Sequence, residues 1–94
     1  MAETIDDITI NYEEGEELIV KELDKEVLTK GAWSTIMFLY QELNRKTKEY
    51  GPVKISIRRY KKAQGVYKQQ SKFNIGSEKQ AKQIVDIINK WYPS

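Results

Sequence analysis

Two stretches in the second half of the chain have the pattern of β-strands, residues 53–62 and Val66–Ile75. Apolar and polar residues alternate at the start of the first, and the second ends in the spaced apolar residues Phe73 and Ile75. The intervening Ala-Gln-Gly at residues 63–65 predicts a tight turn between them. Successive side chains of a strand point to opposite faces. One face of the first strand is therefore expected to carry Lys54, Ser56, Arg58, Tyr60 and Lys62. On the other face, Val53, Ile55 and Ile57 are expected to point into a core.

Residues 18–28 fit two kinds of element. Their β-branched residues favour a strand, whereas their Glu, Lys and Leu content would allow a helix. We predict a strand, because Gly31 and the strongly strand-like residues 33–43 follow at hairpin distance.

The stretch 33–43 is apolar on both faces. Trp33, Thr35, Met37 and Leu39 share one face, and Ile36, Phe38 and Tyr40 share the other. A strand with one solvated face would alternate instead, so both sides of this sheet need a cover. The sequence offers one helix, and a second subunit is the natural candidate for the other side.

The helix is predicted after Ser77. Ser77 with Gln80 fits a capping box. The residues that follow at helical spacing form an apolar stripe, and Pro93 ends it. The stripe consists of Ala81, Ile84, Val85, Ile88 and Trp91. The expected fold is α+β: a four-stranded antiparallel β-meander followed by one C-terminal α-helix.

The first 16 residues are expected to form an acidic, partly flexible N-terminal arm, and residues 17–94 a single β-β-β-β-α domain. Ile5, Ile8 and Ile10 could still add an edge strand to the sheet. Ninety-four residues suit one domain. No apolar run approaches the roughly 20 residues that span a membrane, and the N-terminus does not resemble a signal peptide, so we expect a soluble cytoplasmic protein with no membrane partner.

The composition argues against catalysis. The chain has no cysteine and no histidine, which excludes disulfides, thiol nucleophiles, imidazole bases and the usual zinc sites. The pairs Glu13/Glu14 and Glu16/Glu17 fall in the arm, where nothing fixes their geometry. Phosphate-binding glycine loops and metal-ligand spacings are absent from the sequence. We expect a protein that is not an enzyme and uses no cofactor or metal.

Charge is segregated along the chain. Residues 1–30 hold ten acids and three lysines, and residues 31–94 hold four acids and thirteen bases, so the two parts carry −7 and +9. Residues 54–72 contain seven bases and no acid. A merely soluble surface mixes both signs, so this stretch indicates a phosphate-binding face. The alternatives are that these cations only keep the strands soluble, or that the acidic arm folds back and neutralises them.

Aromatic and polar residues accompany the bases. Tyr60 and Tyr67 either stack on bases or pack as cross-strand aromatics. Gln69, Gln70, Ser71 and Asn74 can hydrogen-bond bases or phosphates. Trp33 and Trp91 fit a core or a subunit interface better than a ligand platform.

The stretch Lys54-Ile55-Ser56-Ile57-Arg58-Arg59-Tyr60 resembles the strand of the form apolar-Ile-Asp-Ile-Arg-Glu-Tyr in the positive-cofactor-four and Whirly group of single-stranded-DNA-binding proteins, which includes small bacterial proteins with no assigned role. The resemblance extends over roughly residues 33–91. It implies a curved antiparallel sheet, a homodimer formed through the C-terminal helix and the sheet, and nucleic acid in basic channels. It also implies that Arg58 contacts DNA, and it places Tyr50 near a family aromatic.

Some positions depart from that pattern. Lys61 stands where the family has a stacking tryptophan, and Lys68 and Lys72 match its lysine-rich fourth strand only loosely. A Glu/Asp arm replaces the family's serine-rich arm.

These observations predict a non-enzymatic protein that binds single-stranded nucleic acid, DNA rather than RNA, as a transcription or DNA-metabolism accessory factor. The residues predicted to contact it are Lys54, Arg58, Arg59, Tyr60, Lys61, Lys62, Tyr67, Lys68 and Lys72, with Arg45, Lys46, Lys48 and Tyr50 as additional candidates. The alternative function is a protein-interaction module of the same fold that docks an acidic partner and binds no nucleic acid.

Overall fold

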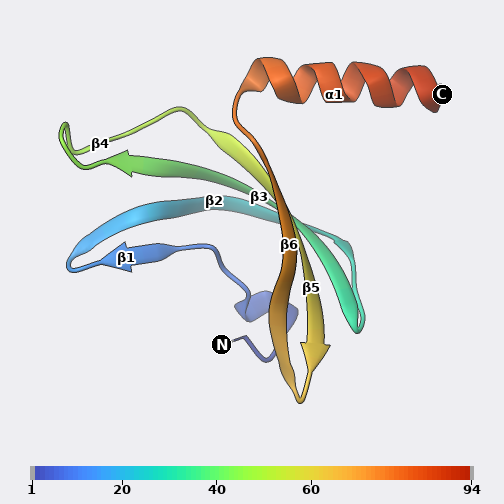
Figure 1. Cartoon of the computed structure of the whole chain (residues 1–94), viewed down its shortest axis with the longest axis horizontal. Coiled ribbons are helices and arrows are strands. Elements are labelled where there is room, and N and C mark those ends of the chain that lie inside the picture. The colour runs from blue at the N-terminus through green and yellow to red at the C-terminus, as the bar shows by residue number, and fades with distance from the viewer. Residues whose placement is uncertain (1, 94) are drawn as a thin grey trace.

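The computed structural model describes residues 2–93 and contains one antiparallel sheet, curled into a half-barrel, with a helix after its last strand (Figure 1). The elements in chain order are a 3₁₀ turn η1 (Ile5–Asp7), β1 (Tyr12–Glu14), β2 (Glu17–Thr29), β3 (Trp33–Asn44), β4 (Glu49–Tyr50), β5 (Lys54–Ala63), β6 (Val66–Ile75) and α1 (Glu78–Trp91). Strands β1, β2, β3, β5 and β6 lie side by side in that order, and β4 pairs with the end of β3. The predicted fold class, an α+β meander followed by one helix, is confirmed.

The four predicted strands appear as β2, β3, β5 and β6, and the strand alternative for residues 18–28 is confirmed. Two short strands, β1 and β4, were not expected. They have three and two residues, too few for an alternating pattern to show. Gly15 has a φ of 61° in the turn that folds β1 back on β2.

Local sequence accounts for the β5–β6 turn and for the start of α1. Gln64 and Gly65 have φ of 53° and 82°, the left-handed pair of a two-residue hairpin turn that suits the twist of the flanking strands. The Ser77 hydroxyl accepts a hydrogen bond from the Gln80 N–H at 3.1 Å. The Gln80 side chain in turn accepts one from the Gly76 N–H at 3.1 Å. The sequence predicted both features, the tight turn between β5 and β6 and the capping of α1 by Ser77 and Gln80.

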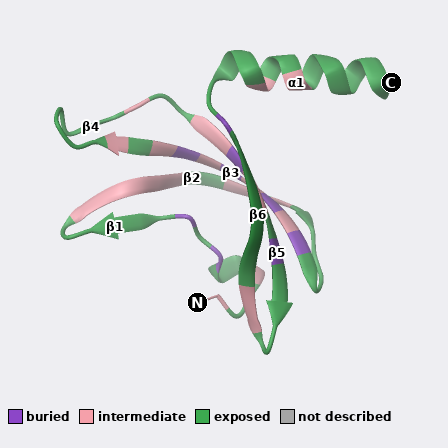
Figure 2. Ribbon diagram, in the orientation of Figure 1, coloured by how far each residue is buried: buried purple, intermediate pink, exposed green. Residues whose placement is uncertain are grey.

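The buried residues of the core lie in β3, in β5 and in the segment before β1 (Figure 2). The core is formed by Ile8, Ile10, Ile36, Phe38, Tyr40 and Tyr60. The pairing of Ser34 with Tyr60 and of Phe38 with Ser56 puts the even-numbered residues of β3 and β5 on the inner face of the curl. The prediction that Val53, Ile55 and Ile57 point into the core is therefore wrong: the apolar cover lies on the opposite face, and Val53 is exposed.

The cover of the inner face is the segment before β1, which lies inside the curl (Figure 1). Ile8 and Ile10 are only 3% and 6% exposed. The Glu22 carboxylate on β2 accepts hydrogen bonds from the Thr9 hydroxyl at 2.8 Å and the Ile10 N–H at 3.2 Å. On the far side of the curl, the Tyr67 N–H donates to the Ala2 carbonyl at 2.8 Å. Residues 2–10 thus bridge β2 and β6, which are separated by two other strands.

Lys25 anchors the same segment. Its side chain points from β2 to the inner face, and its ammonium donates to the carbonyl oxygens of Ile5 at 3.1 Å, Asp6 at 3.1 Å and Ile8 at 2.8 Å. The carbonyl groups around η1 are thereby satisfied by one positive charge. No local pattern in the sequence indicates this role for Lys25.

Replacing Lys25 with methionine is expected to lower the free energy of unfolding by about 2 kcal/mol, because three carbonyl oxygens lose a charged donor. Urea unfolding followed by circular dichroism measures the change. Lys30→Met is the matched control, since the Lys30 side chain is exposed and makes no hydrogen bond or ion pair within residues 2–93. Equal losses in the two variants would contradict the role assigned to Lys25.

The outer face of the sheet is apolar and has no comparable cover within residues 2–93. Met37 and Leu39 of β3 and Ile57 of β5 are only half-buried, and Phe73 of β6 is exposed. Burial alternates strictly along β3, so the chain itself buries one face of this strand and leaves the other half-buried. Helix α1 meets this face at its first turns, beside Ile75, which is 4% exposed, and then projects away from the end of β6 (Figure 1).

Candidate nucleic-acid interface

The cations of β5 and β6 divide between the two faces of the sheet. Lys54, Arg58, Lys62 and Lys72 lie on the inner face, and Arg59, Lys61 and Lys68 lie on the outer face. An irregularity in the pairing opposite residues 59 and 60 leaves Gln70 without a partner in the register. This bulge shifts the alternation of β6 by one residue and places Lys68 directly across from Lys61.

The outer-face cations surround an exposed tryptophan. Trp33, at the start of β3, pairs with Lys61 and is 44% exposed. The Arg59 guanidinium carbon lies 4.7 Å from the Trp33 ring centroid, and the Lys61 ammonium lies 5.4 Å from it. Both distances fall in the range of cation–π contacts. We refer to Trp33, Arg59, Lys61 and Lys68 as the outer basic cluster.

Arg58, the position that matches the motif arginine, is engaged by polar neighbours on the inner face. Its Nε donates to the Ser56 hydroxyl at 3.0 Å, and one terminal nitrogen donates to the Gln69 side chain at 3.0 Å. Ser56 is fully buried, and its hydroxyl also donates to the Asn74 side-chain oxygen at 2.6 Å. Arg58 therefore completes a buried polar network.

The two tyrosines of the hairpin occupy different environments. Tyr60 is 6% exposed and packs in the core with Ile8 and Ile10. Burial raises the pKa of Tyr60 above its usual value, against the opposing charge of Arg58. Tyr67 is half-buried, its hydroxyl donates to the Gly31 carbonyl at 3.2 Å, and the Lys62 ammonium lies 5.3 Å from its ring centroid. Tyr60 is therefore closed to stacking in this structure, whereas Tyr67 keeps part of its surface accessible.

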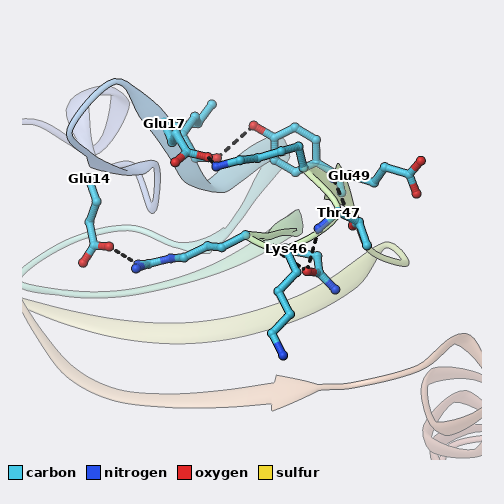
Figure 3. A network of polar contacts seen from close by, with 10 residues as sticks. Glu14, Glu17, Lys46, Thr47 and Glu49 are labelled. Atoms are coloured by element: carbon cyan, nitrogen blue, oxygen red, sulfur yellow. Dashed lines mark hydrogen bonds and ion pairs between the residues drawn. The ribbon is translucent and has the colours of Figure 1, made fainter.

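The additional candidates in the loop between β3 and β5 are paired with the acidic hairpin of β1 and β2 (Figure 3). Arg45 forms an ion pair with Glu14, and the Lys48 ammonium lies 2.8 Å from the Glu17 carboxylate. The Tyr50 hydroxyl donates to the Leu18 carbonyl at 2.8 Å. The side chain of Lys46 makes no such contact within residues 2–93.

Neutralisation by the acidic hairpin is therefore local to the loop. Of the seven cations in residues 54–72, Lys54 has an acidic partner in the part of the chain that the structure describes: its ammonium lies 2.9 Å from the Glu42 carboxylate. This hydrogen bond and charge raise the pKa of Lys54. The other six form no ion pair within residues 2–93, and they are Arg58, Arg59, Lys61, Lys62, Lys68 and Lys72. Over the described residues, carboxylates do not interleave with these strand cations.

The described residues show no group of three or more acidic side chains arranged to hold a metal ion. Within residues 2–93, no helix has the length and apolar character needed to cross a membrane. Comparison of the chain with family models, with curated proteins and with solved structures gave no match. The assignment of function therefore depends on the geometry of the site itself.

Proposed function

We propose that this protein binds single-stranded nucleic acid without catalysing a reaction, and that the outer basic cluster is its main contact. The observation that supports this most directly is an exposed tryptophan flanked by Arg59 and Lys61, with no carboxylate paired to either cation within residues 2–93. Cations bind the phosphate backbone, and an indole or guanidinium plane stacks on bases.

The arrangement favours a single strand over a duplex. Lys61 and Lys68 face the same side of neighbouring strands and form a short cationic row across the hairpin. Trp33 and Arg59 lie next to that row. A single strand offers phosphates and unstacked base faces together, whereas a duplex keeps its base faces stacked. The exposed inner-face residues Lys62 and Lys72 extend the cationic surface at the other side of the hairpin.

The sequence resemblance agrees with this proposal. A curled antiparallel sheet followed by a helix is the architecture that the positive-cofactor-four and Whirly resemblance implies. Membership of that group, a preference for DNA over RNA, and an accessory role in transcription or DNA metabolism are parts of the proposal. We assign the main contact to the outer face instead of Arg58 and Tyr60, because Tyr60 is packed in the core with Ile8 and Ile10.

Fluorescence anisotropy with single- and double-stranded 20-mers, at 50 and 200 mM salt, tests the proposal. We expect tighter binding of the single strand, with log K falling linearly against log salt at a slope of about −2 for three phosphate contacts. Equal affinity for the duplex would contradict stacking on Trp33. Absence of binding to every oligonucleotide at 50 mM salt would overturn the proposal and leave the protein-interaction module.

A further inference from the structure

A hollow of about 610 Å³ lies between the segment before β1 and the ends of two hairpins, β2–β3 and β5–β6. A volume of about 300 to 1,000 Å³ is usual for a site that holds a small molecule. We refer to this hollow as the arm pocket. Its polar lining includes Lys30, Lys62 and Tyr67 from the hairpins, and Glu3 and Asp6 from the segment before β1.

Hydrogen bonds of Tyr67 and Lys25 hold the walls of the arm pocket together. The Tyr67 hydroxyl donates to the Gly31 carbonyl at 3.2 Å, which fixes the turn after β2 against β6. The Tyr67 N–H donates to the Ala2 carbonyl at 2.8 Å, which fixes the start of the described chain beside the same strand. The Lys25 ammonium holds the carbonyl oxygens around η1. These contacts determine the shape of the pocket before any ligand binds.

One end of the arm pocket combines positive charge with an aromatic ring. Lys30 and Lys62 are exposed, and neither forms an ion pair within residues 2–93. The Lys62 ammonium lies 5.3 Å from the centroid of the Tyr67 ring, and that ring is only half-buried. Two cations beside an accessible ring suit a phosphate group attached to a planar base.

The acidic groups of the arm pocket lie toward its other end. The Asp6 carbonyl contacts the Lys25 ammonium, and Lys25 precedes Lys30 by five residues, about 16 Å along an extended chain. Glu26 pairs with Met37 and therefore lies toward the outer face of the sheet. Carboxylates accept hydrogen bonds from the exocyclic amino groups of bases. The pocket thus favours a ligand with a phosphate at one end and amino donors at the other.

We propose that the arm pocket receives the terminal nucleotide of a single strand, with the end phosphate at Lys30 and Lys62 and the base toward Tyr67 and the carboxylates. This inference rests on the proposed function and names the part of the strand that the protein recognises. An interior nucleotide would have to enter and leave past the same walls, whereas a chain end needs only to enter.

The arm pocket adjoins the outer basic cluster at the end of the sheet. Lys62 follows Lys61 in β5, and its N–H donates at 2.7 Å to the carbonyl of Ala32, the residue before Trp33. A strand bound to the cluster therefore reaches the pocket by passing over the ends of the hairpins. The cluster would hold the body of the strand, and the pocket would hold its end.

A linear strand and its closed circle test this proposal. A 5′-phosphorylated linear 40-mer and the circle made by ligating it have the same sequence and the same number of phosphate groups, and a 3′-phosphorylated 40-mer presents the other end. Fluorescence anisotropy at 50 mM salt measures each affinity. We expect at least one linear form to bind on the order of 10-fold tighter than the circle, the effect of about one hydrogen bond to a charged group. A circle that binds as tightly as both linear forms would overturn the end site and leave the proposed function standing, whereas absence of binding to all three would overturn both.

Lys30→Met is the matched substitution, because it removes one cation of the arm pocket without breaking an ion pair within residues 2–93. It is expected to abolish the preference for the linear form. Lys79→Met removes one exposed charge from α1 and is expected to keep that preference. A Lys30→Met variant that still prefers the linear strand would overturn the role of the pocket.

Deoxycytidine 5′-monophosphate probes the arm pocket without the rest of a strand. In amide NMR spectra we expect the largest shifts at Lys30, Gly31 and Tyr67, and smaller shifts with thymidine 5′-monophosphate, whose base has no exocyclic amino group. Largest shifts at Trp33 and Arg59, or no shift at millimolar nucleotide, would overturn the assignment of the end to this pocket.

Discussion

A chain carrying Ile8→Ala and Ile10→Ala is expected to lose about 4 kcal/mol or more of its free energy of unfolding. Each residue is almost fully buried against Ile36 and Phe38, and truncating a buried isoleucine to alanine costs about 2 to 5 kcal/mol. A small domain has about 5 to 15 kcal/mol in total, so the double variant should be close to unfolded at physiological temperature.

Urea unfolding followed by tryptophan fluorescence and circular dichroism measures this loss. Glu13→Ala, an exposed substitution in β1 of the same arm, is expected to change stability by less than about 0.5 kcal/mol. If the double variant unfolded like the wild type, residues 2–10 would not lie inside the curl. For the same reason, deleting the N-terminal arm would first test whether the chain folds, and only then whether the arm neutralises the strand cations.

The elements that the sequence predicted well are those determined by local patterns. Residues 53–58 alternate between apolar and polar, Gln64 and Gly65 select the turn that follows this strand, and Ser77 caps the helix through a hydrogen bond three residues away. Each of these signals depends on neighbours in the chain. They determine where an element begins and ends, and they agree with the observed bounds to within one or two residues.

The choice of buried face could not be predicted in the same way. Residues 33–43 are apolar on both faces, so the pattern is symmetric and leaves open which side the chain itself covers. The answer comes from Ile8 and Ile10, which lie in an acidic segment with too few apolar residues to predict a packed element. Their burial depends on contacts with β2, β3 and β5, and on the donors of Lys25, all remote in sequence.

The candidate site was predictable in part. The alternation of side chains along a strand is enough to place Arg58 and Arg59 on opposite faces of the sheet. The bulge at Gln70, which moves Lys68 to the outer face, has no signal in the local sequence. Trp33 reaches Lys61 because β3 pairs directly with β5 across a nine-residue connection, residues 45–53, that contains β4. A loop of that length does not determine a register, so the tryptophan could not be placed beside the cations from sequence.

The largest functional effect is expected from Arg59→Glu combined with Lys61→Glu. Both side chains are exposed and unpaired within residues 2–93, so reversing them removes two phosphate contacts and adds repulsion. We expect affinity for a single-stranded 20-mer at 50 mM salt to fall on the order of 100-fold, and the salt slope to shrink by about 1.4. The melting temperature should change little, because the substitutions remove only two exposed cation–π pairs from the fold.

The matched control reverses the same number of charges on the inner face, with Lys62→Glu and Lys72→Glu, both exposed. Net charge then falls by four in either variant, so a difference in affinity between them reports position and not total charge. We expect the inner-face variant to bind several-fold tighter than the outer-face variant. Arg58 is unsuitable for this comparison, because its substitution would strip the buried Ser56 hydroxyl of a donor and lower stability. Equal losses in the two double variants would show that the protein binds through diffuse charge, and the outer basic cluster would lose its assigned role.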